Sequence, residues 1–257
     1  QKPITVQNTS IITFSNTAPS SPFNGFTENL PLLFSELRKV PHDFAVHLGN
    51  MVHGGSSEKG IKNTDLNRQY TILNKLYINY PVAVYTIAGN SDILDKSNKV
   101  YSAHLKKTAN YSFNYGKLHC VVCNTVTIKE TDVVADLRWL ANDLKKHKDN
   151  FFIIVFTHNP IFLPKGRWGQ HRDRKIYHTI FQTYGVKAVI SSNRHKFYKI
   201  EKDNITYYTL GTFGYNIGDS YWYYNQYYII KIKDNKVLIE PKKIHFGKLR
   251  YKLLHAK

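Results

Sequence analysis

The chain has 257 residues, 42% hydrophobic and 14% aromatic, which is enough to bury a real core, and we expect one domain over residues 1–257. No apolar run approaches the length of a bilayer-spanning helix, so we expect no membrane span in this chain. The formal net charge of +18 favours an anionic partner, such as nucleic acid, a membrane surface, acidic glycans or an acidic protein. Lysines spread over solvated faces would give the same total charge.

The first half of the chain alternates strand and helix patterns. β-Favouring runs at 11–14, 44–48 and 82–88 predict strands, the third of them buried. Between these runs, apolar residues at helical spacing predict a helix at 27–40 and a second helix that Thr64 caps. The order strand, helix, strand, helix, strand predicts a parallel core.

The second half opens with a hairpin and ends in an all-β region. Its strand patterns lie at 111–115, 118–124, 152–157, 186–191, 196–200, 205–210, 226–233 and 236–240. One amphipathic helix at 132–147 carries Asp143 on its outward face, and another helix ends near Gly185. Cys120 and Cys123 lie three apart on one strand and point to opposite faces, which favours two core thiols over a disulfide or a metal pair.

Polar residues follow several of these strands directly. They are Asn16, Asn50, the run Asn90, Ser91 and Asp92, then His158, and finally the run Asn193, Arg194 and His195. Ligands of α/β proteins bind at the carboxyl ends of the strands. The sequence therefore predicts one rim that carries asparagines and histidines.

The order of the elements and these rim peptides resemble the calcineurin-like metallophosphoesterases, especially their purple acid phosphatase branch. The resemblance covers nearly the whole chain and is clearest in the peptides 111–116, 136–146, 156–161, 181–186 and 208–212. It implies an α/β fold, the metallophosphoesterase-type four-layer sandwich of two mixed β-sheets flanked by helices. In that family, five rim motifs hold two metal ions that clamp a phosphate ester and activate a bound water.

The first two motifs have lost their carboxylates. The Gly-Asp-x-Gly motif of the family corresponds to residues 15–18, where Asn16 replaces the liganding Asp. The Gly-Asp-x-x-Tyr motif corresponds to residues 49–53, where Asn50 replaces the metal-bridging Asp and His53 replaces the Tyr.

The other three motifs are partly kept. Gly-Asn-His-Asp/Glu corresponds to residues 89–92, which retain Asn90 and Asp92 but have Ser91 in place of the catalytic His. Val-x-x-His retains His158, and Gly-His-x-His retains only its final residue, His195.

These changes argue against catalysis. Two adjacent cations need anionic ligands to offset their repulsion, and both liganding carboxylates are gone. Ser91 cannot protonate a leaving group at neutral pH. Asn16, Asn50, Asn90 and Asn193 can instead form a neutral hydrogen-bonded network. We therefore expect a catalytically inactive pseudoenzyme without a cofactor, which binds protein partners or acts as a structural subunit of a protein assembly.

Two alternatives remain open. One is an active metal-dependent phosphoesterase that holds zinc, iron or manganese on His53, Asn90, His158 and His195. The other is a polyanion-binding protein in which Arg194, Lys165 and Arg167 contact a phosphate or an acidic side chain, although a solvated basic loop explains these residues as well. Sequons permit N-glycosylation, so we expect a secretory or extracytoplasmic location. The sequons begin at Asn8, Asn110 and Asn204.

Overall fold

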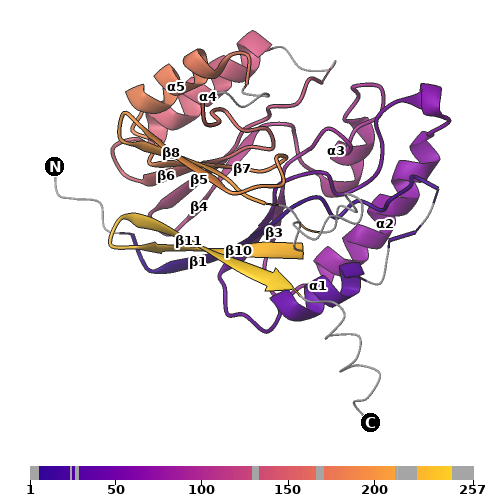
Figure 1. Ribbon diagram of the computed structural model, residues 1–257. Coiled ribbons are helices and arrows are strands. Elements are labelled where there is room, and N and C mark those ends of the chain that lie inside the picture. The colour runs from indigo at the N-terminus through magenta and orange to yellow at the C-terminus, as the bar shows by residue number, and fades with distance from the viewer. Residues whose placement is uncertain are drawn as a thin grey trace.

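Two mixed β-sheets pack face to face, and helices cover their outer surfaces (Figure 1). The computed structural model describes residues 6–23, 25–26, 29–128, 133–165, 171–211, 213 and 225–244. The layers run helix, sheet, sheet, helix, which confirms the α/β fold that the sequence predicts.

The first sheet has the strand order β11–β10–β1–β2–β3. Its strands are β1 (Thr9–Phe14), β2 (Phe44–His47), β3 (Val84–Thr86), β10 (Asn225–Lys233) and β11 (Lys236–Ile244). Strands β1, β2 and β3 are parallel, and helices α1 (Asn29–Leu37) and α2 (Asn63–Ile78) form the crossovers between them, as predicted. The prediction of a buried third strand was wrong, because β3 is a three-residue edge strand on which Val84 and Tyr85 are only partly buried.

The second sheet has the order β4–β5–β6–β7–β9–β8. Its strands are β4 (Tyr111–Tyr115), β5 (Leu118–Val122), β6 (Phe152–Phe156), β7 (Ala188–Ser191), β8 (Tyr198–Lys202) and β9 (Ile205–Thr209). The central strands are parallel, and an antiparallel hairpin closes each edge. Helices α4 (Val133–His147) and α5 (Arg174–Thr183) cover its outer face (Figure 1). Strands β5, β6 and β7 are buried on both faces, which explains why they are almost entirely apolar; the exceptions are His119 on β5 and Ser191 on β7.

The apolar core fills three spaces: between the sheets, and beneath each helical layer. Ile11 and Ile154 are fully buried between the sheets, whereas Leu140 of α4 is buried under the outer helices. Cys120 belongs to the first of these clusters and Cys123 to the second, and both thiols are free, as their spacing predicts. Each fully buried aliphatic side chain stabilises the fold by about 1.5–3 kcal/mol, so these layers fix the position of the strand ends.

Two local predictions need correction, and one helix was missed. Helix α2 begins at Asn63 with Lys62 as its N-cap, so Thr64 lies inside the first turn; the Asp65 carboxylate accepts the Lys62 N–H at 2.9 Å. Helix α3 (Lys99–Leu105) was not predicted, because it is short and buries only Tyr101. Asp143 does not face solvent but points inward to β5. The 3₁₀ helix η1 (Ser57–Lys59) completes the elements, and within the described ranges no helix is long and apolar enough to cross a membrane.

Candidate functional site

Loops from both sheets meet where the parallel strands end. The N–H of Asn16, after β1, donates to the carbonyl of Gly49, after β2, at 2.9 Å. The Ser15 hydroxyl lies 2.6 Å from the Ser192 hydroxyl, after β7, and this contact joins the two sheets. Segments far apart in the sequence thus form one rim.

Two asparagines occupy the positions where the resemblance places metal-liganding aspartates, and their amides bond directly to each other. Asn50 Nδ2 donates to Asn16 Oδ1 at 2.7 Å. Asn50 Oδ1 accepts both the N–H and the hydroxyl of Ser91, each at 3.0 Å. Because the Ser91 N–H can only donate, it fixes which way the Asn50 amide points. Two carboxylates at this separation would repel each other, whereas two amides attract.

The backbone at these positions also suits asparagine. Asn16, Asn50 and Asn193 have left-handed φ angles of 57°, 58° and 67°. Among residues with a side chain, Asn and Asp adopt this conformation most readily. An Asp-to-Asn change therefore removes a charge without disturbing the shape of the loop.

The other two predicted amides lie outside this chain of hydrogen bonds. Asn193 Nδ2 donates to Asn159 Oδ1 at 2.6 Å. Asn90 is exposed and makes no hydrogen bond to the described part of the chain. The predicted amide network is therefore centred on Asn16, Asn50 and Ser91.

Asp92 is fully buried and holds two rim loops together. Its Oδ1 accepts the N–H groups of Met51 and Val52 at 2.6 and 3.0 Å, and its Oδ2 accepts those of Asn50 and Gly89 at 2.7 and 2.6 Å. Burial raises the pKa of Asp92 to about 7, and the four backbone N–H groups oppose that shift. All four partners are donors, so the geometry is that of a structural carboxylate whose acceptor sites are filled.

His158 is also fully buried, behind the rim. Its Nδ1–H donates to the Leu48 carbonyl at 2.7 Å, which leaves a lone pair on Nε2, and Nε2 has no partner among the described atoms. Burial lowers the pKa of His158 to about 4, so the imidazole is neutral at physiological pH. A Cβ on Gly49 would come within 2.5 Å of His158 Nδ1, and one on Gly89 within 2.8 Å of Cε1, so both positions require glycine.

The rim surrounds a pocket of about 480 Å³. Its lining comprises residues 16–20, 29, 30, 50, 53–55, 90, 91, 193, 195 and 213. None of these described lining residues is Asp, Glu, Lys or Arg, so this wall combines amide, hydroxyl and imidazole groups with apolar side chains such as Leu30 and Phe213. Burial and the neighbouring Arg194 lower the pKa of His195, which favours its neutral form.

The predicted anion-binding residues do not line this pocket. Arg194 is half-buried and absent from the wall, and Lys165 is exposed on the loop that follows β6. Arg167 lies outside the described residues. Sequence reasoning missed the contribution of Asn29 and Leu30, because only the placement of α1 brings them to the pocket.

The donor set of the pocket does not fit a pair of divalent cations. Among the described residues no carboxylate lines it, and the acceptor sites of Asp92 are occupied by N–H groups. His158 Nε2 has no partner among the described atoms and could accept a metal, yet His158 is not among the described residues that line the pocket. The three histidines of the single-metal alternative do not bring their nitrogens within 4.8 Å of one another; within the described ranges only His119, Asp143 and His147 bring three such donors together.

Comparison with protein-family models identifies the family of this chain. The family model described as calcineurin-like phosphoesterase matches residues 23–197, more than half of the chain. The chain belongs to the calcineurin-like phosphoesterase family. Comparison with curated proteins gave no match.

Solved structures agree with this calcineurin-like fold. A dimetal phosphatase from Danio rerio has a TM-score of 0.71 at 10% identity, with 91% of this chain and 96% of that chain covered. GAP50, described as the anchor in the inner membrane complex of Plasmodium, has a TM-score of 0.63 at 13% identity, with 92% and 84% covered. A putative 5′-nucleotidase from Staphylococcus aureus has a TM-score of 0.52 at 11% identity, with 92% and 53% covered. At these identities the likeness shows the fold alone.

Proposed function

We propose that this chain is a catalytically inactive calcineurin-like phosphoesterase that serves as a binding or structural subunit of a protein assembly. One observation carries the proposal: Asn16 and Asn50 bond to each other at 2.7 Å where the family resemblance places carboxylate ligands. The pair carries no negative charge, and Asn50 Oδ1 already accepts two hydrogen bonds from Ser91, so the pair lacks the anionic ligands that a dinuclear centre requires.

The rest of the rim supports the same proposal. Ser91 stands where the family motif has its catalytic His, and its hydroxyl donates to Asn50 rather than facing a leaving group. Asp92, the remaining acid of the motif, accepts hydrogen bonds from backbone N–H groups. These contacts support a pocket that keeps the framework of the family's site but lacks the carboxylate ligands and the catalytic His of the family motifs.

Two of the three structural neighbours illustrate the alternatives, an enzyme and an anchor, between which an experiment must decide. The Danio rerio protein is described as a dimetal phosphatase, and GAP50 as an anchor. The same fold thus accompanies an enzyme in one case and an anchoring protein in the other, so the residues of the rim have to decide between them.

Metal analysis and a turnover assay test the proposal directly. The purified protein is assayed with a generic phosphate monoester in the presence of added zinc, iron or manganese, and we expect no hydrolysis above that of the metal ions alone. Activity with two bound metals per chain, lost in His158→Ala, would overturn the proposal. A pull-down from the native source, run in parallel, identifies the partner.

A double variant, Asn16→Asp with Asn50→Asp, tests the physical reason. Its two carboxylates would face each other across the 2.7 Å contact, so we expect a lower Tm than wild type in EDTA and a rise in Tm on addition of manganese. Asn204→Asp is the matched control, because Asn204 has a similar left-handed backbone but lies exposed in the β8–β9 turn. A double variant as stable as this control in EDTA would count against the explanation.

A second candidate function, polyanion binding, rests on the charge of the β10–β11 hairpin. Five lysines of this hairpin are exposed, whereas its acidic residues are Asp234 and Glu240. They are Lys231, Lys233, Lys236, Lys242 and Lys243. Retention on heparin at physiological salt, with a steep dependence on salt concentration, would support this function; elution in the void volume would remove it.

A further inference from the structure

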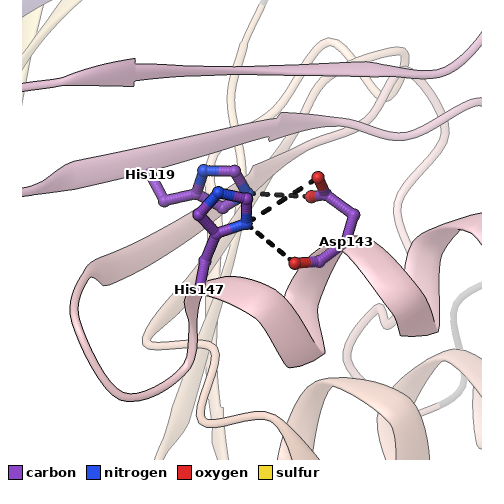
Figure 2. A group of neighbouring side chains, drawn as sticks. All are labelled: His119, Asp143 and His147. Atoms are coloured by element: carbon purple, nitrogen blue, oxygen red, sulfur yellow. Dashed lines mark hydrogen bonds and ion pairs between the residues drawn. The ribbon is translucent and has the colours of Figure 1, made fainter.

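A second cluster of chemically capable side chains lies away from the pocket, on the outer face of the second sheet. His119 lies on β5, and Asp143 and His147 lie one turn apart on α4. Figure 2 shows the two imidazole rings face to face, with both pointing toward the Asp143 carboxylate. None of the three residues lines the pocket.

The donor atoms of this cluster converge. His119 Nε2 lies 2.8 Å from Asp143 Oδ2, and His147 Nδ1 lies 3.8 Å from Asp143 Oδ1. One donor atom from each residue falls within 4.8 Å of the other two. Two ligand atoms of tetrahedral zinc, each about 2.0–2.2 Å from the ion, lie about 3.4 Å apart. The His119–Asp143 pair would therefore separate slightly and the His147–Asp143 pair would approach slightly on binding.

Outer hydrogen bonds orient the two less exposed members. Asn114 Oδ1 accepts from His119 Nδ1 at 2.6 Å, so the Nε2 atom is the one that points at the carboxylate. The Ser112 hydroxyl donates to Asp143 Oδ1 at 2.8 Å. Partners of this kind, on the far atom of a liganding His or carboxylate, accompany metal sites generally, because they fix the ligand's orientation.

Charge and access are also suitable. Burial opposes the charge on Asp143, but hydrogen bonds from His119 and Ser112 and the nearby imidazoles hold the pKa of this carboxyl below its usual range. The carboxylate is therefore ionised at neutral pH. His119 is buried, whereas the His147 side chain is 21% exposed, which leaves one side of the cluster open to solvent.

We propose that His119, Asp143 and His147 form a site for a single divalent transition-metal ion, of which zinc fits the two-nitrogen, one-oxygen donor set best. The ion replaces the proton between His119 Nε2 and Asp143 Oδ2. His147 Nδ1–H, which donates to the Asp143 carbonyl at 2.8 Å, gives up that bond, and the proton moves to Nε2 through solvent. The His147 ring tilts out of its stack, and water completes the coordination shell.

Such an ion would tie β5 to α4, and thereby the edge hairpin to the outer helix. The site differs in position and ligands from the pocket, so the two can be tested independently. Cobalt is the probe, because its visible absorption reports four-coordinate nitrogen and oxygen ligation, and zinc competition then gives the affinity for the metal alone. We expect one ion per chain for the wild-type protein at neutral pH, with weaker binding as pH falls.

Three variants decide the location. His147→Gln alters the exposed ligand and Ser112→Ala removes only an outer partner; circular dichroism and urea unfolding verify that each is folded. We expect roughly 10-fold weaker zinc binding in Ser112→Ala and a larger loss in His147→Gln. The matched control, His53→Ala with His195→Ala, should bind as wild type does.

Absence of binding by the folded wild-type protein, or unchanged affinity in His147→Gln, would overturn this site. If the His53/His195 control loses binding instead, the ion lies in the pocket. That result would overturn the site at His119, Asp143 and His147, and it would also count against the proposal that the pocket holds no metal.

Discussion

His158→Asn isolates the effect of one buried imidazole on acid stability. Asn is chosen because its Nδ2 can replace the His158 Nδ1–H that donates to the Leu48 carbonyl, while nothing in the new side chain titrates. The variant leaves a small cavity, which lowers its stability at every pH by a constant amount. The informative quantity is therefore the slope of stability against pH.

The sign and size of the effect follow from the two pKa values. In the unfolded chain this His binds a proton near pH 6.5, but burial lowers the folded-state pKa to about 4. Between these values the unfolded chain holds the extra proton, so acid favours unfolding. The free energy of unfolding should fall by up to about 1.4 kcal/mol per pH unit, and by about 2 kcal/mol in total from pH 6.5 to 4.5, through His158 alone.

Urea unfolding of wild type and His158→Asn, followed by circular dichroism across this pH range, measures the difference. Other titrating groups, such as His47 and Asp92, remain in both proteins and largely cancel. We expect the wild-type stability to fall more steeply than that of the variant below pH 6.5, and the two slopes to be equal above pH 7. Parallel profiles throughout would refute the assignment of a neutral, buried imidazole.

Three further outcomes can be checked by simpler measurements. Asp92→Asn should lower the free energy of unfolding by about 2–4 kcal/mol in urea, because an amide cannot accept all four N–H groups that the carboxylate accepts. Gly89→Ala should destabilise by at least about 1–3 kcal/mol, since its Cβ would lie 2.3 Å from a backbone nitrogen, whereas Gly25→Ala, with open space around it, should be neutral in the same thermal melt. Cys120 and Cys123 should resist a disulfide-exchange reagent until denaturant unfolds the chain, because burial raises the pKa of both thiols; rapid native labelling would contradict their placement.

Most of the fold could be predicted because its parallel strands are mostly short apolar runs that are followed within three residues by Gly or Asn. The parallel core and the hairpins follow from that alternation. Elements with weak amphipathic patterns were harder: α3 buries only Tyr101, and β3 sits at an edge, where fewer apolar residues are needed. Thr64 is a good capping residue by type, but Lys62 caps α2 because the Asp65 carboxylate reaches its N–H.

The candidate site also combines features that the sequence predicts with features that only the structure shows. The rim positions of Asn16 and Asn50 follow from strand ends, but the hydrogen bond between them depends on how β1 and β2 pair. The role of Asp92 could not be predicted, because a carboxylate in a motif looks the same whether it faces a pocket or four backbone N–H groups. Helical periodicity alone predicts that Asp143 faces outward. Its partner His119 lies on a strand, so the spacing of residues along the helix gives no sign of this contact.

The strand order of the first sheet has a consequence for how the chain is made. Ile11 of β1 pairs with Ile230 of β10, so one edge of β1 stays without its partner until the β10 segment, more than 200 residues later, has been synthesised. At about 5–20 residues per second, that interval is on the order of ten seconds or more. The N-terminal half emerges from the ribosome with an apolar strand edge exposed, which is the kind of surface that chaperones hold and that aggregation begins from. The first sheet therefore cannot be completed before β10 has been synthesised.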